Sequence, residues 1–339
     1  MVSKEAKTLT VFALVMINVA AVANLAQLSV LAEYGLSAIF FIGAASLIFF
    51  VPVALVSAEL ATGWPQTGGV YIWVKEAFGK GWAFLAMWLL WFENVIWYPT
   101  ILSFAAATIA FIFNPALATN PIYTFAIILL IAWGATFMNL RGMKTSSLIS
   151  TFGVWVGVLF PLLLIIALSL IWLSSGGTPQ IDLSMQNLVP EMGNLASLVF
   201  LVGVLLSLSG MEMSAIHAGS VKDPQTNYPK AILISAVIIF LTLTLGSLAI
   251  SLAIPRSEIV LTAGIMEAFQ YFFNEFNILW FLPMMALLIA VGSIGTVSTW
   301  LAGPSKGLLV TAKDGSLPPF FQKVNENGMP ANVLITQAA

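Results

Sequence analysis

The sequence predicts an all-helical protein that crosses a membrane several times, and two observations carry this prediction. Of its 339 residues, 60% are hydrophobic and only 8% are charged, whereas a soluble domain carries about 25% charged residues. The apolar residues also fall in long runs, and a helix needs about 20 such residues to cross a bilayer. A soluble fold of this length cannot bury so much apolar surface, so we expect a polytopic membrane protein.

Eight apolar runs are long enough to span a bilayer, and short connections separate most of them. They cover residues 9–31, 36–62, 81–113, 122–140, 148–173, 195–218, 229–253 and 278–303, the last with an alternative end near 312. A ninth span begins near Pro330. The two longest connections, about 174–194 and 254–277, have room for small helices.

The charges of the connections predict how the chain is oriented. If the N-terminus lies in the cytoplasm, every basic residue except Arg256 falls on the inner side, as the positive-inside rule requires. The inner residues are Lys4, Lys7, Lys75, Lys80, Arg141, Lys144, Lys222, Lys230, Lys306, Lys313 and Lys323. The outer side collects Glu33, Asp182, Glu191, Glu258, Glu267 and Glu275. A wrong number of spans would scramble this alternation, so the charges support eight spans in a cell membrane.

The composition excludes several classes of function. The chain has no Cys, which excludes disulfides and thiolate metal sites, and its single His, His217, argues against a His-based metal centre. A net charge of −2 offers no basic face to a nucleic acid. The sequence contains neither a P-loop nor an HExxH motif. We therefore expect a protein that is not an enzyme, needs no cofactor and draws on gradients for any transport.

Three carboxylates fall inside predicted spans, at Glu59, Glu93 and Glu212. A charge at the bilayer centre costs at least about 2.5–3.5 kcal/mol, so such residues usually face a cavity or a partner. Glu59 lies near the inner end of its span, where a structural role is the simpler interpretation. Glu93 and Trp97 are four residues apart and share a helix face. That face suits a ligand with an ammonium group, or Glu93 is protonated and bonds to a neighbouring helix.

Glu212 lies in the stretch LLSLSGMEMSAIH, where small and polar residues interrupt an apolar run. Ser207, Ser209 and Gly210 weaken a helix, because serine side chains compete for backbone hydrogen bonds and glycine is flexible. A break here would expose backbone groups in mid-membrane, which is tolerated where they are buried or line a cavity. We therefore predict a functional break beside Glu212. The alternative is a neutral, buried Glu in a packing seam, and His217 has the pattern of a packed residue.

The first span carries a matching feature in NVAAVANLAQ, where Asn18, Asn24 and Gln27 lie among small residues. Interrupted helices at corresponding positions, five helices apart, indicate an inverted repeat of the kind found in secondary transporters. The repeat predicts two units: residues 1–174 with helices 1–5, and residues 175–339 with helices 6–8 and the start of helix 9.

Three longer motifs resemble one family in the right order along the chain. AELATGWPQTGGVYIWVKEAFG resembles the end of helix 2 and the following loop in the amino acid–polyamine–organocation (APC) superfamily of transporters. SLSGMEMSAIHAGSVKDPQTNYPKAI is similar to that superfamily's helix 6 and the loop after it. STWLAGPSKGLLVTAKDGSLPPFFQKVNENGMP is similar to the end of helix 8 and the inner loop beyond. The bacterial glutamate/GABA antiporter branch is the nearest in character.

The resemblance implies a LeuT-like fold of 5+5 inverted repeats, in which substrate binds between broken helices 1 and 6, flanked by helices 3 and 8. Gly210 and Glu212 match the family's helix-6 break and its Glu, which is linked to substrate sensing or proton coupling. Trp300 matches a helix-8 Trp at the substrate cavity. The expected substrate-binding residues are Ala20, Ala21, Ala23, Asn24, Glu93, Trp97, Ser207, Ser209, Gly210, Glu212 and Trp300, with proton coupling at Glu212.

Two departures from the family pattern accompany this resemblance. The family's helix 1 commonly has a Gly-rich break, which this chain replaces with NVAAVANLAQ. The chain also stops at the start of helix 9, so the second repeat is expected to be incomplete, as in a truncated gene or a partial chain.

The sequence thus predicts a secondary transporter of amino acids, working as an antiporter or with proton coupling, on glutamate/GABA-like or neutral substrates. A polyamine or basic amino acid transporter is the first alternative, because Glu93, Glu212 and the Trp-rich third span would attract a cation. A non-transporting membrane sensor or scaffold is the second. The expected partners are an amino acid and the lipid bilayer, without nucleic acid; a homodimer is an open alternative.

Overall fold

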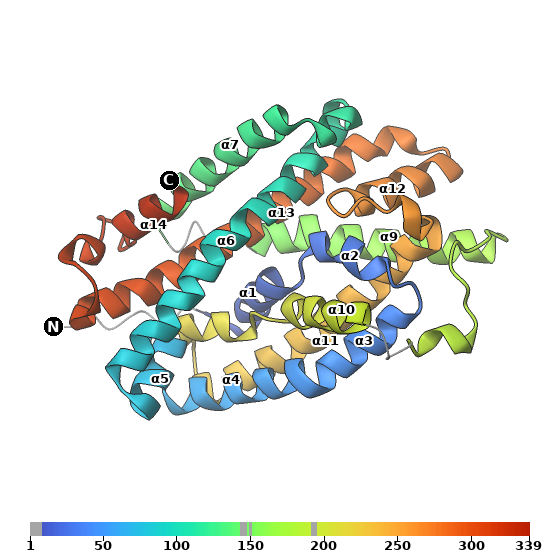
Figure 1. Cartoon of the computed structure of the whole chain (residues 1–339). Helices are drawn as coiled ribbons and strands as arrows, with labels where there is room; N and C mark the ends of the chain where they lie inside the picture. The colour runs from blue at the N-terminus through green and yellow to red at the C-terminus, as the bar shows by residue number, and fades with distance from the viewer. Residues whose placement is uncertain (1–8, 143–147, 149–150, 191–194) are drawn as a thin grey trace.

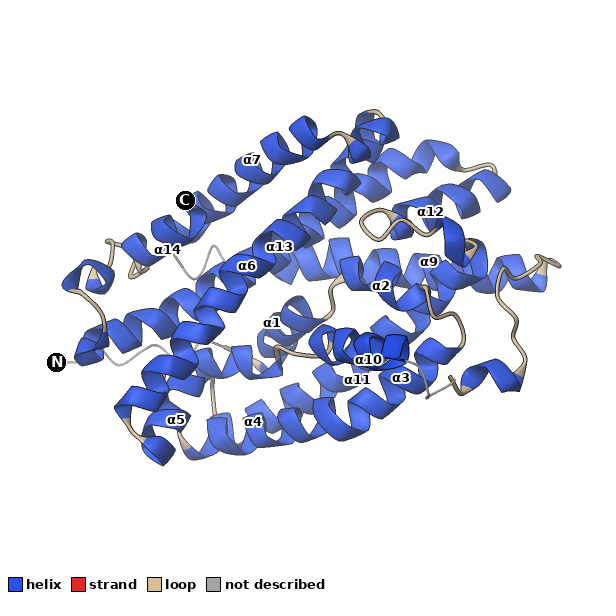
Figure 2. Ribbon diagram, viewed as in Figure 1, coloured by secondary structure: helices blue, strands red, loops and turns tan. Residues whose placement is uncertain are grey.

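A computed structural model describes residues 9–142, 148, 151–190 and 195–339. Within these residues the chain is helical and its connections form no sheet, as Figure 2 shows. Seven helices are long and apolar enough to cross a membrane, and a bent helix pair makes a possible eighth span. The prediction of an all-helical polytopic protein is therefore confirmed.

The first span is broken, as its sequence predicts. Helix α1 (Val11–Val22) and helix α2 (Leu25–Ala32) meet at an angle of 46°. The Asn24 side chain caps α2 by accepting a hydrogen bond from the backbone N–H of Ala26 at 3.0 Å. This side chain satisfies one of the backbone donors that a helix start leaves free. The amide therefore stabilises a break that lacks the usual glycine.

The second span runs from Ser37 to Gly63 through α3 (Ser37–Ala45), a π-helical turn η1 (Ser46–Phe50) and α4 (Val51–Gly63). A short helix that the sequence analysis did not predict, α5 (Val70–Phe78), follows it. The turn between α4 and α5 contains Gly69, whose φ is +48°. A Cβ at Gly69 would lie 2.9 Å from the backbone nitrogen of Ile216, so glycine permits a close approach of two backbones.

The next three spans agree with the predicted ranges. They are α6 (Lys80–Phe113), α7 (Pro121–Leu140) and the segment Thr151–Ser174, which contains a π-helical turn η3 (Trp155–Leu159) and α9 (Phe160–Ser174). A 3₁₀ turn, η2 (Pro115–Thr119), joins α6 to α7, and another, η4 (Met185–Leu188), follows α9. Asn120 begins α7 by accepting hydrogen bonds from the N–H groups of Ile122 and Tyr123.

The sixth span is also broken, close to the predicted position. Helix α10 (Leu195–Ser207) ends, three residues follow, and the chain continues as a 3₁₀ helix, η5 (Met211–Ser220). Gly210 allows this change of course because its φ of +114° is rarely adopted by other residues. The end of η5 pairs with the residues that precede α1: Leu9 N–H donates to Ser220 O and Lys222 N–H donates to Leu9 O, both at 3.0 Å.

The seventh span, α11, covers Pro224–Ala253. The sequence analysis expected it to start at 229, and this start was wrong by five residues. Pro224 occupies the first helical turn, where a missing N–H costs nothing. Pro229 follows within the helix and removes one hydrogen bond near its beginning.

The remaining elements complete the chain. The connection between α11 and α13 holds η6 (Arg256–Glu258) and α12 (Gly264–Glu275), so the expectation of small helices there is confirmed. After η7 (Leu279–Phe281), the eighth span α13 (Leu282–Thr311) reaches the longer of its two expected ends and passes into η8 (Ala312–Ser316). A turn, η9 (Pro319–Gln322), leads to α14 (Ala331–Ala338), the start of the predicted ninth helix.

Two long helices form a frame around the broken spans. Figure 1 shows α6 and α13 running alongside each other, and α1 packs against α13. Helix α13 also crosses η3 at Gly157 and Gly292, where the two backbones touch so closely that neither glycine has room for a Cβ. Small residues at such crossings let helices in a membrane pack by close van der Waals contact.

A polar cluster joins α5 to the far end of α13. Tyr71 donates a hydrogen bond to the Asp314 carboxylate at 2.6 Å, and Lys75 forms an ion pair with the same carboxylate at 2.7 Å. Lys80 donates to the backbone oxygen of Asp314. Burial, together with the bond to Asp314, raises the pKa of the Tyr71 phenol above its ordinary value. The phenol therefore stays protonated and keeps its role as a donor.

The helices run between two ends of the molecule, as alternating spans require. Figure 1 places α5 and the η8–α14 segment at one end, and α12 with the connection after α9 at the other. Of the charges used to predict the orientation, Lys4, Lys7, Lys144 and Glu191 lie outside the described residues.

Candidate functional site

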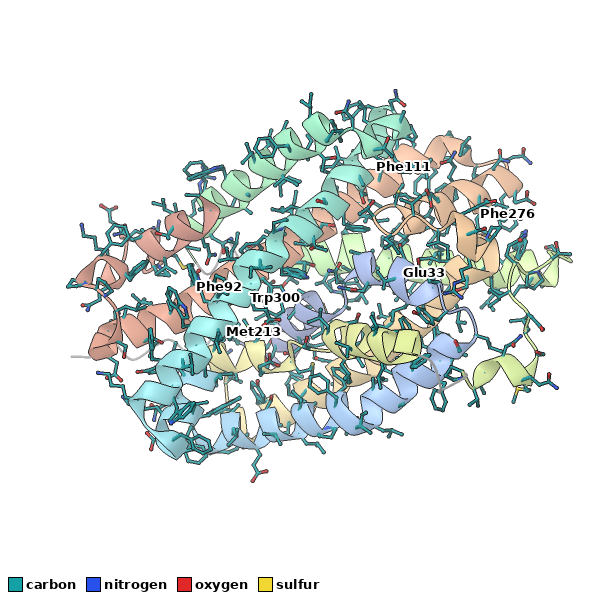
Figure 3. The ribbon with its side chains drawn as sticks, in the orientation of Figure 1. Glu33, Phe92, Phe111, Met213, Phe276 and Trp300 are labelled. Atoms are coloured by element: carbon teal, nitrogen blue, oxygen red, sulfur yellow. The ribbon has the colours of Figure 1, made fainter. Side chains whose placement is uncertain are left out.

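The two helix breaks meet in the middle of the molecule. The last turn of α1, the start of α2 and the end of α10 face α6 and α13 there, and together they enclose a cavity of about 50 Å³. Figure 3 labels Trp300 in this region, between α6 and the α1–α2 break. The residues that line this cavity are Ala21, Val22, Asn24, Gln27, Glu93, Asn94, Trp97, Leu206, Ser207, Ser209 and Trp300. The cavity is thus narrow and mixes amides, hydroxyls, one carboxylate and two indoles.

Most of the residues predicted from sequence are brought together at this cavity. The ones that line it are Ala21, Asn24, Glu93, Trp97, Ser207, Ser209 and Trp300. Ala20 and Ala23 are fully buried and do not line it. Gly210 lies behind the lining: a Cβ there would lie 3.0 Å from the Trp300 ring. Gly210 therefore serves both the backbone turn and the seating of the indole.

Trp300 connects α13 to the break in the first span. Its Nε1–H donates a hydrogen bond of 2.9 Å to the backbone oxygen of Ala21. This acceptor lies near the end of α1, where carbonyl groups lose their helical partners. The Trp300 ring also packs against Trp97 of α6, with centroids 5.6 Å apart and planes at 45°. One indole thus satisfies the broken backbone and forms an aromatic wall with its neighbour.

A second, more open cavity of about 610 Å³ adjoins the first along α6. Its described lining is apolar except for Glu93 and Glu212, and includes no basic residue. Glu93 lines both cavities and is exposed, whereas Glu212 is partly buried at the first turn of η5. The backbone N–H groups of Gly210 and Glu212 face the Glu212 carboxylate. The two carboxyl groups therefore border one space.

Residues beyond Glu212 pack into the protein instead of lining either cavity. His217 is 5% exposed, in agreement with the interpretation of a packed histidine. Ser214 and Tyr228 of α11 share a hydrogen bond of 2.7 Å between their hydroxyl oxygens. The later part of η5 is thus held against α11, while the first turn of η5 presents Glu212 to the open cavity.

Sequence reasoning missed two polar residues of the small cavity as site residues. Gln27 was noted only as part of the break, and its Oε1 lies 3.3 Å from Ser207 Oγ. Asn94 was not singled out. Its Nδ2 donates to the Trp300 backbone oxygen at 3.1 Å, while its buried Oδ1 has no hydrogen-bond partner. The position of Asn94, next to Glu93 on a helix that faces a predicted break, was the available signal.

Replacing Trp300 with Phe is expected to lower the free energy of unfolding by about 1–3 kcal/mol, because Ala21 O loses its donor inside the protein. Apparent melting temperature in detergent measures this. Trp133→Phe is the matched control, because Trp133 packs against Phe137 and lines neither cavity. An equal fall in the apparent melting temperature of the two variants would show that the hydrogen bond from the Trp300 indole does not stabilise the protein.

Within the described residues, no group of three or more His, Cys, Asp or Glu side chains is arranged to hold a metal ion. The small cavity instead offers hydrogen-bonding groups of both kinds, aromatic faces and a single carboxylate at the meeting point of two broken helices. Backbone groups at such breaks, with polar side chains around them, suit a small polar solute carried through a membrane.

Comparison with known proteins gives a consistent result. A model of a family described as amino acid permease matches residues 7–339. An uncharacterized transporter of Legionella pneumophila is 46% identical over 331 residues, covering 98% of this chain and 71% of the relative. A glutamate/gamma-aminobutyrate antiporter of Lactococcus lactis is 30% identical over 336 residues, covering 98% of this chain and 67% of the relative. A protein of Lactococcus lactis named as a probable agmatine/putrescine antiporter is 25% identical over 280 residues, covering 81% and 58%.

Proposed function

Because the chain belongs to the amino acid permease family of the APC superfamily, we propose that it is a secondary transporter that exchanges amino acids across the cell membrane. One observation carries the proposal: the breaks of the first and sixth spans meet at a small polar cavity lined by Trp97 and Trp300. Broken helices near the middle of the membrane form the substrate sites of secondary transporters.

The substrate class that we favour is a glutamate/GABA-like or neutral amino acid. The relatives named as glutamate/gamma-aminobutyrate antiporters support it, since they match 98% of the chain. A substrate carboxylate would be stabilised by free backbone N–H groups at a helix start, such as that of α2, because these groups and the helix dipole favour negative charge. Glu212 would carry a proton that is coupled to transport, since it faces a cavity within the span.

A polyamine or a basic amino acid is the second candidate substrate. Glu93 and Glu212 border the open cavity, and its described lining offers no basic residue to neutralise them. A relative named as an agmatine/putrescine antiporter is consistent with this candidate but is less similar.

Three further features belong to the same proposal. The positive-inside rule supports a cytoplasmic N-terminus. The corresponding breaks support a division into repeats at residues 1–174 and 175–339. A homodimer is compatible with the exposed apolar helices, which a bilayer also covers.

A panel of radiolabelled substrates tests the function. The purified chain is reconstituted in proteoliposomes loaded with glutamate, GABA, leucine, arginine or putrescine, and exchange is followed at acidic and at neutral pH. We expect exchange of glutamate, GABA or a neutral amino acid that is faster at acidic pH. Exchange of only arginine or putrescine would select the second candidate, and binding of an amino acid without exchange would indicate a sensor. Empty liposomes supply the control.

A further inference from the structure

The hydrogen-bond donors of the small cavity are largely used within the protein. Asn94 Nδ2 donates to the Trp300 backbone oxygen, and Trp300 Nε1 donates to Ala21 O. Ser207 and Ser209 each donate to a backbone oxygen of α10, at 2.9 Å and 2.6 Å. Ser207, Ser209 and Trp300 therefore have no further hydrogen to give to a ligand, since each hydroxyl carries one proton and the indole one, whereas Asn94 Nδ2 keeps its second hydrogen.

The acceptors on the α6 side of the cavity are free. Asn94 is only 3% exposed, and its Oδ1 has no hydrogen-bond partner among the described residues. The amide cannot be turned over, because Oδ1 would then meet the Trp300 carbonyl oxygen, which is also an acceptor. Buried polar atoms nearly always have a partner, and each exception needs an explanation. Of the described residues with such an unpartnered atom, only Asn94 lines the small cavity, where a ligand that donates a hydrogen bond would satisfy its Oδ1.

Glu93 adds a negative charge on the same wall. It precedes Asn94 on α6 and lines the small cavity beside it. None of the residues that line either cavity is basic, and the one salt bridge between described side chains joins Lys75 to Asp314. Of the other ionisable side chains nearby, Glu212 is acidic, Tyr228 is bonded to Ser214, and His217 lies deeper, near Lys306 of α13. Neither His217 nor Lys306 lines a cavity, so the α6 wall carries a carboxylate with no basic residue beside it in the lining.

The two indole rings of the cavity also favour a cation. Trp97 and Trp300 stand 5.6 Å apart at 45° and both line the cavity. The face of an indole ring attracts a cation, more strongly when the cation is out of water.

The opposite wall has the reverse polarity. Asn24 Oδ1 accepts the hydrogen bond from Ala26 N–H that caps α2, so its Nδ2 is the end of the amide left for a ligand. Asn24 lines the same cavity from the α1–α2 break. The cavity therefore has a donor at the broken first span and acceptors with a negative charge at the third.

We infer that Glu93 and Asn94 Oδ1, between the indoles of Trp97 and Trp300, form a subsite for the primary ammonium group of the substrate. The substrate's carboxylate then points toward Asn24 and the α1–α2 break. The subsite rests on the proposed transport function and specifies it: it selects ligands with an ammonium group at one end of a short chain. Asn94 is a specificity-determining residue that sequence reasoning did not identify.

Binding to the purified full-length chain tests the subsite, with tryptophan fluorescence as the readout. The probes are 4-aminobutyrate, butyrate, glutarate and putrescine. Butyrate lacks only the ammonium group, and glutarate replaces it with a second carboxylate. We expect 4-aminobutyrate to bind at least about tenfold more tightly than butyrate and glutarate, because a desolvated ammonium gains both charge pairing and ring contact.

Two substitutions with matched controls assign the effect to its residues. Asn94→Leu and Glu93→Gln should each weaken 4-aminobutyrate binding by about tenfold or more. Asn139→Leu controls for loss of a buried amide, because Asn139 also donates to α13, at Ser298, and also has an unpartnered Oδ1, yet lines neither cavity. Glu59→Gln controls for loss of a carboxylate within a span. Both controls should retain binding to within about twofold.

The outcomes separate the subsite from the transport function. Butyrate or glutarate binding as tightly as 4-aminobutyrate would overturn the subsite, even if amino acid exchange is observed. So would wild-type affinity in both Asn94→Leu and Glu93→Gln, or binding of none of the probes. Putrescine binding that depends on Glu93 and Asn94, without exchange of any amino acid, would support the subsite and overturn amino acid transport.

Discussion

Replacing Glu212 with Gln is expected to abolish the pH dependence of substrate uptake in proteoliposomes. Glutamine has nearly the same shape but carries no proton that it can release. Glu212 lies at the first turn of η5 and faces the cavity along α6, where the described lining has no basic residue. A charge within the membrane costs at least about 2.5–3.5 kcal/mol. Uptake should therefore require Glu212 to be protonated in one step and to release its proton in another. Wild-type uptake should therefore rise as the pH falls, whereas the variant should give a flat profile.

The control for this experiment is Glu59→Gln, because Glu59 is exposed on α4 and lines neither cavity. That variant should keep the wild-type pH profile. If Glu212→Gln also keeps it, Glu212 does not carry the coupled proton. Size-exclusion profiles of both variants check that they are folded, so that a flat profile is not the result of inactive protein.

A single methyl group at Gly157 is expected to destabilise the protein by about 1–3 kcal/mol or more. Gly157 lies in η3 where the fifth span crosses α13, and a Cβ there would overlap the backbone of Leu288 and Gly292. Backbone atoms cannot move aside as a flexible side chain can, so the two helices would have to separate. Separation would remove the close contact that packs the helices together, since apolar attraction between helices is weak in lipid. The apparent melting temperature of Gly157→Ala in detergent measures the effect.

Gly134→Ala supplies the opposite expectation. Gly134 lies within α7 with nothing within 4 Å of its Cβ position, and alanine stabilises a helix interior by about 0.5–1 kcal/mol relative to glycine. The same chemical change should thus lower stability at one glycine and raise it slightly at the other. Equal effects at both sites would show that the crossing at Gly157 is looser than the structure indicates.

Much of the fold could be predicted because lipid imposes one simple rule on the sequence. Every span needs about 20 apolar residues, and the eight predicted ranges correspond to the seven long helices and the bent pair. The two breaks were also predictable, since Ser207, Ser209 and Gly210, like Asn24, offer local partners or conformations that compete with a helix.

The rest of the fold depends on contacts that a linear pattern does not contain. Helix α5 forms in a segment that reads as a loop, because Gly69 lets the chain approach Ile216 and Tyr71 bonds to Asp314. These partners lie more than 140 residues further along the chain. The start of α11 was missed because two prolines, Pro224 and Pro229, can each begin a helix, and only the fold selects the first.

The candidate site was predictable to a similar depth. Charge in an apolar run identified Glu93 and Glu212, and helix periodicity placed Trp97 beside Glu93. Asn94 escaped notice because its significance comes from a carbonyl group of α13 that takes its Nδ2 and leaves its Oδ1 free. Ala20 and Ala23 were also expected to bind substrate, yet both side chains are buried in the protein interior.

The short pairing between Leu9 and Val221 acts as a clasp. Leu9 lies two residues before α1, and Val221 directly follows η5, so two hydrogen bonds fasten the start of one broken span to the end of the other. A gap that opens between these two segments at that surface must first undo both bonds. A rigid-body movement in which the two segments move together leaves both hydrogen bonds intact.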